Sequence, residues 1–268
     1  MLSSLATGYA AVRGYQQIID TVAHNLANTN TIAFKERRIS FHELPLETLR
    51  QRRLPHTGNN LPEPAVGTGT APASLKTFFE TGALDFSGNP FHLAIMGEGF
   101  FAVTRPDGSR AYTRAGAFSV DAAGFMVTSG GDRLVGVHNL HEKGMDSRDG
   151  SLSIASDGKV LFVSSAADGA IAQETLGTIP LYRFSNPQQL LPHEDNTLIP
   201  VEDSGPPQQG VPGEGGFGEI KQGYLEKANV DLSQQMVALI LGQRSLQAAA
   251  RAMVVADELW TLTLNVRA

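Results

Sequence analysis

The residues of this chain that could do chemistry are histidines beside glutamates, scattered carboxylates and one glycine-rich loop. His–Glu pairs occur at His42-Glu43, His141-Glu142 and His193-Glu194, but none has the second histidine that a zincin helix requires. The run Gly213-Glu-Gly-Gly-Phe-Gly218 fits the dinucleotide-binding spacing, yet it follows a Pro-rich loop and not a strand, which favours a flexible loop. No Gly-x-Ser-x-Gly elbow occurs, and the sequence gives no basis for pairing two carboxylates as a glycosidase dyad. We therefore expect no enzyme: no catalytic residue, no cofactor and no metal site.

Composition and charge restrict the partners of the chain. Its 268 residues are enough to bury a good core, as one large or two small domains. The formal net charge of −6 argues against nucleic acid as the main partner. Because there is no cysteine, disulfides and thiolate metal sites are excluded.

The beginning of the chain does not resemble a cleavable secretory signal. Met1-Leu-Ser-Ser4 carries no basic side chain, and polar residues and glycines such as Gly8, Arg13 and Gly14 interrupt the apolar run. No stretch approaches the ~18 apolar residues that a membrane span requires, so we expect no membrane insertion. By these criteria the protein is cytoplasmic, unless it leaves the cell by a route without a cleaved signal.

A cluster of basic residues follows the first predicted helix. Nearby glutamates offset part of its charge, so we interpret it as a solvated or subunit-facing surface, with contact to anionic cell wall or lipid as the alternative. The basic residues are Lys35, Arg37, Arg38, Arg50, Arg52 and Arg53, and the glutamates are Glu36, Glu43 and Glu47.

Both ends of the chain have the pattern of a coiled-coil helix. Mostly apolar positions follow one another at alternating steps of three and four, which places them on one face of an underwound helix that requires a partner helix. These positions are Leu2, Leu5, Tyr9, Val12, Gln16, Ile19, Ala23 and Leu26, and then Leu232, Met236, Leu239, Gln243, Leu246, Ala250, Met253, Asp257, Trp260 and Leu264. The first helix is predicted from about Ser3 to about Asn28, where short polar side chains compete for backbone hydrogen bonds. The last is predicted to begin near Asp231, which starts a variant of the capping box.

The middle of the chain has the pattern of an antiparallel β domain over roughly 90–205. Turn signals such as Pro106-Asp-Gly108 and Ser156-Asp-Gly158 separate short apolar runs such as Phe100-Phe-Ala-Val-Thr104. Pro- and Gly-rich stretches at 56–72 and 205–218 read as loops. The predicted fold class is therefore α+β: long N- and C-terminal helices that pair as a coiled coil, with an all-β middle domain.

Three ordered blocks resemble the bacterial flagellar rod and hook (axial) protein family. The first is Asn25-Leu-Ala-Asn28-Thr-Asn30-Thr-Ile-Ala-Phe34-Lys35. The second is Leu93-Ala-Ile-Met-Gly97-Glu-Gly99-Phe-Phe101-Ala-Val103 with Tyr112-Thr-Arg-Ala-Gly116. The third is Gln222-Gly223-Tyr-Leu225-Glu226-Lys-Ala-Asn229-Val230, followed by Gln243-Arg244. Ala33 replaces the family's usual glycine, which leaves open whether the backbone there adopts a positive φ. Ala228 stands where the family commonly has serine.

Within the family, the length and residues 41–89 are most like the distal-rod members, with the proximal-rod members as the alternative. The resemblance implies a structural subunit of the basal-body rod, outside the cytoplasmic membrane, that polymerises into a rigid helical tube and transmits torque to the hook. It implies copies of itself, other flagellar rod and hook proteins and the flagellar type III export apparatus as partners. The corresponding division is residues 1–30 (first helix), 31–90 (extended segment), 91–205 (β domain), 206–230 (loop and return strand) and 231–268 (last helix).

The residues that we single out are therefore candidates for assembly and not for catalysis. Gln243 is a buried polar residue of the predicted seam that would fix its register, and the asparagines hold the end of the first helix. The full set is Leu5, Tyr9, Val12, Ile19, Leu26, Asn25, Asn28, Asn30, Phe34, Met236, Leu239, Gln243, Leu246, Met253, Trp260 and Leu264. Their contacts form within one subunit or across subunits. A two-helix core inside a self-contained globule, a secreted enzyme or adhesin, and a self-contained secreted binding protein remain as alternatives.

Overall fold

The computed structural model describes residues 2–43, 47–48, 65–66, 70–138, 140, 150–165 and 171–266, which form an α+β structure of two long helices and antiparallel sheets. Two compact units make up the chain. Unit 1 comprises Met1–Ala27, Arg37–Thr77 and Asp231–Ala268, and unit 2 comprises Asn28–Glu36 and Phe78–Val230. Several features named above lie outside the described residues: the pair at 141–142, the arginines at 50, 52 and 53, and most of the stretch at 56–72.

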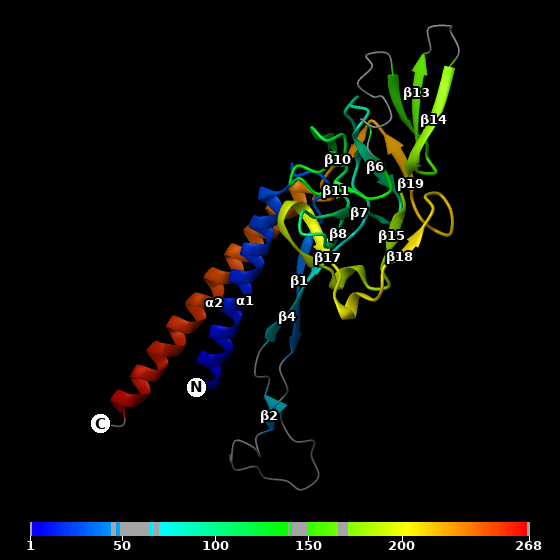
Figure 1. Ribbon diagram of the computed structural model, residues 1–268. Coiled ribbons are helices and arrows are strands. Elements are labelled where there is room, and N and C mark those ends of the chain that lie inside the picture. Colours follow the sequence, from blue (N-terminus) through cyan, green and yellow to red (C-terminus); the bar gives the residue numbers. More distant parts are fainter. Residues whose placement is uncertain are drawn as a thin grey trace. The chain divides into compact units, whose positions relative to one another are not determined.

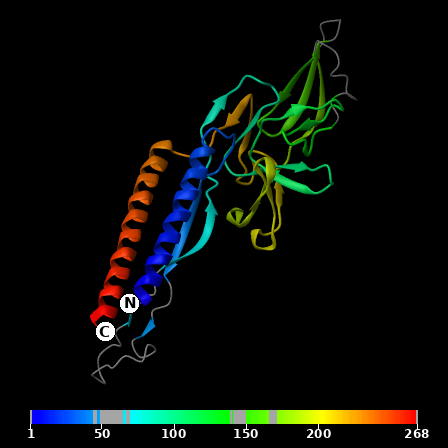
Figure 2. The same cartoon turned by 90° about the vertical axis from the view of Figure 1, so that its left-hand side faces the viewer.

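Unit 1 contains both long helices, α1 (Leu2–Ala27) and α2 (Leu232–Val266), close to the predicted bounds. They lie side by side and antiparallel, with the two chain ends at the same end of the pair (Figure 1, Figure 2). Glycine allows this close approach: a Cβ at Gly8 would lie 2.6 Å from Met253 Cγ, and a Cβ at Gly242 would lie 3.1 Å from Ile19 Cγ1. Asp231 caps α2, because its carboxylate accepts hydrogen bonds from two backbone N–H groups of the first turn.

A β ribbon covers another side of α1 in unit 1. Strand β1 (Arg37–Glu43) pairs antiparallel with β4 (Thr70–Thr77), with a register shift between Ser40 and Phe41. A Cβ at Gly14 of α1 would lie 3.2 Å from the Phe41 ring, so a second glycine of α1 admits a neighbouring side chain. Strands β2 (Glu47–Thr48) and β3 (Ala65–Val66) pair with each other.

The largest sheet of unit 2 is antiparallel throughout. Its strands follow the order β16-β17-β8-β7-β11-β10-β9, while β15 also pairs with β7 and β18 pairs with β15. The strands are β7 (Phe100–Thr104), β8 (Arg110–Thr113), β9 (Ser119–Val120), β10 (Met126–Val127), β11 (Arg133–Leu134), β15 (Leu181–Arg183), β16 (Leu191–Pro192), β17 (Thr197–Ile199) and β18 (Gln208–Gly210).

Smaller antiparallel sheets complete unit 2. Strands β12 (Gly150–Ile154), β13 (Lys159–Ser165) and β14 (Ile171–Thr178) form one sheet of three. Strand β6 (Leu93–Met96) pairs with β19 (Glu219–Gln222), and β5 (Leu84–Phe86) pairs with β20 (Tyr224–Glu226). Single turns of 3₁₀ helix lie at Pro187–Gln189, Glu194–Asn196 and Glu202–Ser204.

Strand β7 shows why the core of unit 2 is closed on both sides. Phe100, Phe101, Ala102 and Val103 are all buried, and successive residues of a strand point to opposite faces. Phe101 and Val103 belong to the larger apolar core, while Phe100 and Ala102 belong to a second cluster with the aromatic rings of Tyr112, Tyr182 and Phe184. An apolar run without alternation is therefore the expected sequence for this strand.

Candidate functional site

Residues from both ends of the chain meet inside unit 2. Backbone N–H groups join them: Ala33 donates to the carbonyl of Glu226 at 2.7 Å, and Asn229 donates to the carbonyl of Phe34 at 3.3 Å. Residues 78–83 complete the arrangement, since Lys227 donates to the carbonyl of Ala83 at 2.8 Å. We call residues 28–36, 78–83 and 222–230 the signature clasp, because the first and third of these segments contain most of the first and third sequence blocks.

The turn that leads into the signature clasp begins where α1 ends. Thr31 donates its backbone N–H to the carbonyl of Asn28, and its hydroxyl bonds the Asn28 side chain. Ala33 has φ of 55°, so this alanine does adopt the left-handed backbone for which glycine is the usual residue. Phe34 directly after it is buried. The turn thus aims residues 34–36 into the interior of unit 2.

A buried group of three charges lies at the centre of the signature clasp. Glu226 is fully buried, and one of its oxygens, Oε1, accepts hydrogen bonds from Lys35 Nζ, from Gly82 N–H at 2.8 Å and from Arg114 at 3.5 Å. Lys35 also donates to the carbonyl of Glu80 at 2.7 Å. Two buried cations therefore share one buried carboxylate, and we call Lys35, Arg114 and Glu226 the charge hub.

The charge hub is electrostatically unbalanced. Burial lowers the pKa of Lys35, although the neighbouring Glu226 carboxylate acts in the opposite direction, and the Arg114 charge lowers the pKa further. Burial likewise lowers the pKa of Arg114 against the pull of Glu226. The second oxygen of Glu226, Oε2, is buried and has no hydrogen-bond partner among the described residues. Such a group costs free energy to bury and contributes specificity more readily than stability.

The Asn229 amide fastens three further backbone groups of the signature clasp. Its Oδ1 accepts a hydrogen bond from the Glu36 N–H at 2.7 Å, and its Nδ2 donates to the carbonyl of Phe78 at 2.9 Å and to that of Glu80 at 3.3 Å. The backbone N–H of Phe78 donates in turn to the carbonyl of Glu36 at 2.9 Å. One side chain of the third sequence block thereby ties residues 36 and 78–80 together.

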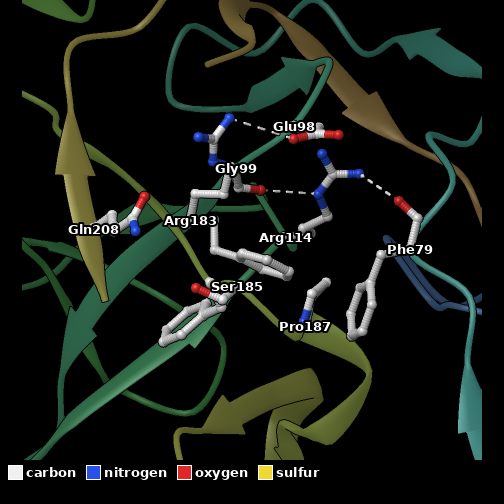
Figure 3. Close-up of a pocket in the computed structure, with 10 residues that line it drawn as sticks. Phe79, Glu98, Gly99, Arg114, Arg183, Ser185, Pro187 and Gln208 are labelled. Atoms are coloured by element: carbon white, nitrogen blue, oxygen red, sulfur yellow. Dashed lines mark hydrogen bonds and ion pairs between the residues drawn. The ribbon is translucent and has the colours of Figure 1, made fainter. Parts of the chain in front are cut away.

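Arg114 connects the charge hub to a cavity of about 440 Å³ in unit 2. Its Nε donates to the carbonyl of Gly99 at 3.0 Å, and one terminal nitrogen donates to the carbonyl of Phe79 (Figure 3). The other terminal nitrogen donates to the carbonyl of Gly97. Three phenylalanine rings line the cavity together with polar residues, which include the Arg183–Glu98 pair at 3.7 Å. The guanidinium of Arg114 donates its hydrogen bonds to backbone carbonyls, so these bonds stabilise the local fold around the cavity.

Unit 1 contains a second and uncharged junction of the two chain ends. The Asn25 side chain of α1 donates to the carbonyl of Arg37 at 2.8 Å and accepts its N–H at 3.0 Å. The same amide donates to Oε1 of Gln235 in α2 at 3.2 Å. Asn25 and Gln235 are both buried, so α1, β1 and α2 share one buried amide contact.

Several large apolar side chains are exposed on the side of α2 away from Gly242 and Met253, with charged residues such as Arg244 and Arg251 between them. Gly242 and Met253 face α1, whereas these apolar side chains are exposed in the part of the chain that the structure describes. We call this set the outward stripe: Val237, Ile240, Leu241, Val255 and Leu262. A helix that is apolar around most of its circumference is normally buried.

The residues singled out from the sequence occupy several different environments. Asn25 and Phe34 are buried, and Asn28 is half-buried while Asn30 is exposed. Val12, Ile19, Leu26, Leu239, Leu246 and Met253 are half-buried on the helices, whereas Tyr9, Met236, Gln243 and Trp260 are exposed. Leu5 and Leu264 lie in α1 and α2, but their side chains are outside the described residues.

Sequence reasoning missed the grouping of Lys35, Arg114 and Glu226. Its interpretation of Lys35 as part of a solvated or subunit-facing basic surface was wrong, because Lys35 is buried and its ammonium bonds Glu226. Each of the three residues stood in one of the three blocks, but nothing in a charged residue's type shows which distant charge it will meet. A sequence signal was present for Gln235. It precedes Leu239 by four positions, so the two side chains lie on the same face of the last helix, beside the predicted seam.

Comparisons with known proteins agree with this arrangement. The family model described as flagellar hook protein FlgE/F/G D1 domain matches residues 94–162, within unit 2. The model described as flagellar basal body rod FlgEFG protein C-terminal matches residues 221–266, which contain β20 and all of α2. The chain is 32% identical to the flagellar basal-body rod protein FlgG of Borreliella burgdorferi over 269 residues, with 100% of this chain and 99% of that protein covered.

The chain belongs to the flagellar basal-body rod protein family. It is also 32% identical to FlgG of Agrobacterium fabrum, with 96% of this chain and 97% of that protein covered. The FlgG of Bacillus subtilis is 31% identical, and both chains are covered completely. This rod protein is therefore a structural subunit of the flagellar basal-body rod and not an enzyme, and it is most like the distal-rod members.

The described part of this rod protein contains no helix that is both long and apolar enough to span a membrane. In the same residues, His, Asp and Glu side chains do not gather in a group of three that could hold a metal ion. The signature clasp, the buried amide junction and the outward stripe are the features of this rod protein on which the proposals below are built.

Proposed function

We propose that this rod protein polymerises through α1 and α2 into a rigid helical tube that transmits torque to the hook. The outward stripe of α2 carries the proposal, because its apolar side chains are exposed in the single chain and need a partner. A second copy of the chain is the proposed partner. Contacts between different surfaces of successive copies give an open filament and not a closed ring, which is the geometry of a rod.

Within each subunit, α1 and α2 pair as a coiled coil in this proposal. The Gly8–Met253 and Ile19–Gly242 contacts and the buried Asn25–Gln235 amide pair support an antiparallel register. The residues proposed to build the helix pair and its contacts with other copies are those singled out from the sequence. The five-part division of the chain, with 1–30 and 231–268 as the helical layer and 91–205 as the β domain, is part of the same proposal.

The proposed partners also include other flagellar rod and hook proteins and the flagellar type III export apparatus. Membership of the rod family supports this proposal, since a rod outside the cytoplasmic membrane is reached by export. The same proposal includes export of this rod protein without a cleaved signal peptide. Neither nucleic acid nor membrane insertion has a role in it.

Two substitutions in the outward stripe test the polymerisation proposal. Leu241→Asp and Val255→Asp each place a charge on the exposed apolar face of α2, where burial against another copy becomes unfavourable. We expect both variants to fold as single chains but to abolish rod completion and motility. Gln189→Asp adds the same charge at an exposed polar position of unit 2, outside the outward stripe, and serves as the control, with motility retained.

A third substitution separates pairing from polymerisation. Leu246→Asp places a charge on the α1-facing side of α2, one turn from Gly242, and so acts on the helix pair itself. We expect it to abolish motility and rod completion while unit 2 stays folded. Normal motility in Leu241→Asp and Val255→Asp would remove the outward stripe from the account, and normal motility in Leu246→Asp would remove the helix pair.

A further inference from the structure

The chain passes between the two units at four points, and all four lie in the signature clasp or beside it. The crossings fall between residues 27 and 28, 36 and 37, 77 and 78, and 230 and 231. Residues 28–36 are therefore an insertion into unit 2 that unit 1 residues flank on both sides. The seating of this short segment decides where the connections to α1, β1, β4 and α2 begin.

Backbone bonding alone does not determine how residues 28–36 are seated. Hydrogen bonds between extended backbones can form in more than one register, because every residue offers the same N–H and C=O groups. Phe34 and the backbone bonds of Ala33 would tolerate a shifted pairing better than Lys35, whose ammonium reaches the interior of unit 2. A shift that separates the Lys35 ammonium from Glu226 leaves a buried unpaired charge, which is strongly unfavourable.

We propose that Lys35 and Glu226 form a register key, with Glu226 as the positioning residue that seats residues 28–36 in unit 2. The key works through discrimination: the carboxylate accepts the ammonium in one register and leaves it unpaired in the others. A single buried polar group at a seam position fixes register in coiled coils by the same physical argument. The key lies within unit 2 and does not depend on whether or how the helices polymerise.

The stoichiometry of the charge hub predicts an asymmetry between the two members of the key. Removal of the Glu226 charge leaves two buried cations, Lys35 and Arg114, without their carboxylate. Removal of the Lys35 charge leaves a balanced Arg114–Glu226 pair. The other carboxylates that act on the hub, Glu80 on Lys35 and Glu98 on Arg114, are exposed, so solvent weakens their effect.

Hydrogen exchange of the full-length chain at backbone amides of the signature clasp tests the proposal. The amides of Ala33 and Phe78 report the seating directly, and amides of β7 and β8 report the core of unit 2. We expect Glu226→Gln to lower protection at Ala33 and Phe78 by at least about a hundredfold, with the core amides much less affected. Lys35→Met keeps the aliphatic stem and should change protection by less than about tenfold.

The double variant Glu226→Gln, Lys35→Met distinguishes a register key from a merely structural ion pair. If Glu226 acts by accepting the Lys35 ammonium, loss of that ammonium should restore part of the protection that Glu226→Gln removes. Asp85→Asn is the matched control, because it removes a carboxylate from the exposed Asp85–Lys227 pair on the same two-stranded ribbon. We expect that control to leave exchange at Ala33 and Phe78 unchanged.

Three outcomes would overturn the register key. The first is unchanged protection at Ala33 and Phe78 in Glu226→Gln. The second is equal loss of protection in Glu226→Gln and Lys35→Met, which is the behaviour of an ordinary ion pair. The third is a Glu226→Gln chain that loses protection throughout unit 2 and that Lys35→Met fails to restore. None of these results bears on polymerisation, which the substitutions in the outward stripe test separately.

Discussion

Units 1 and 2 bury their apolar residues in opposite ways. In unit 2, strand β7 is covered on both faces by residues of the same unit, and Phe101 and Val103 are completely buried. In unit 1, α2 covers one of its faces with α1 and leaves the outward stripe exposed, with Leu241 61% exposed. Unit 2 therefore completes its core alone, whereas unit 1 has apolar surface that a further partner must cover. This difference is what the proposed assembly through the helices requires, and it predicts that unit 2 is stable without other copies of the chain.

The largest expected effect sharpens this comparison directly. Phe101→Ala removes a fully buried ring from the core of unit 2 and should lower the free energy of unfolding of that unit by about 3–5 kcal/mol. Leu241→Ala removes an exposed side chain of unit 1 and should change the stability of the single chain by less than ~0.5 kcal/mol. Urea unfolding followed by hydrogen exchange at β7 and by the fluorescence of Trp260, the single tryptophan of the chain, reports the two units separately. Similar losses in both variants would break the comparison.

Asn25 provides the next largest effect, because its side chain is buried and hydrogen-bonded in unit 1, whose helix α2 otherwise has many exposed apolar side chains. Asn25→Ala leaves the backbone N–H and carbonyl of Arg37 without the amide and should destabilise unit 1 by about 2 kcal/mol. Asp20→Ala, at an exposed position of the same helix, is the matched control and should be nearly neutral. Unfolding followed by Trp260 fluorescence measures both. An unchanged midpoint for Asn25→Ala would show that the amide junction does not hold unit 1 together.

Ala33 tests the backbone strain in unit 2. Ala33→Val places a β-branched side chain at φ of 55° and should destabilise unit 2 by about 1–2 kcal/mol. Ala33→Gly relieves the strain but removes a buried methyl group and adds freedom to the unfolded chain, so its net effect should stay within ~1 kcal/mol. Exchange at the amides of unit 2 gives both values. A Val variant as stable as the parent chain would contradict a left-handed Ala33.

The smallest expected effect is the pH dependence that Lys35 contributes to unit 2. Its pKa is lowered in the folded chain, chiefly by burial, so the folded state binds the Lys35 proton less well than the unfolded state. The resulting destabilisation is present in full below the lowered pKa and disappears as the pH rises through the lowered pKa towards the unfolded value of ~10.4. The free energy of unfolding of the parent chain, minus that of Lys35→Met, should therefore increase as the pH rises across this window. A difference that falls with pH would show that the ammonium is stabilised on folding.

The sequence was sufficient for the two helices and for turns of the β region, but the loops predicted at 56–72 and 205–218 contain β3, the start of β4 and β18, and the contacts between elements were not predicted. Polar residues after Ala27 and the Asp231 cap are local signals, so the helix bounds lie close to those predicted. The turns at Gly108 and Gly158 are local in the same sense, and both glycines have positive φ. The charge hub could not be predicted, because Lys35, Arg114 and Glu226 come from three segments that are far apart in the chain and meet only in the folded unit.

The helix pair shows the same limit in another form. A count of apolar residues gave no weight to Gly8 and Gly242, yet these glycines allow α1 and α2 to approach closely. Tyr9, one position from Gly8, is 64% exposed in the single chain. Periodicity identifies an apolar face, but the smallest side chains decide how near the partner helix can come.

Cysteine accessibility of the outward stripe tests the central claim most directly. The chain contains no cysteine, so Leu241→Cys introduces a single thiol at the middle of the stripe, and Val103→Cys provides a buried reference in unit 2. The account predicts rapid reaction of Cys at position 241 with a water-soluble maleimide in the dilute chain, at least tenfold slower reaction in assembled rods, and slow reaction at position 103 in both. Equal reaction rates at position 241 before and after assembly would contradict the claim that other copies of the chain cover α2.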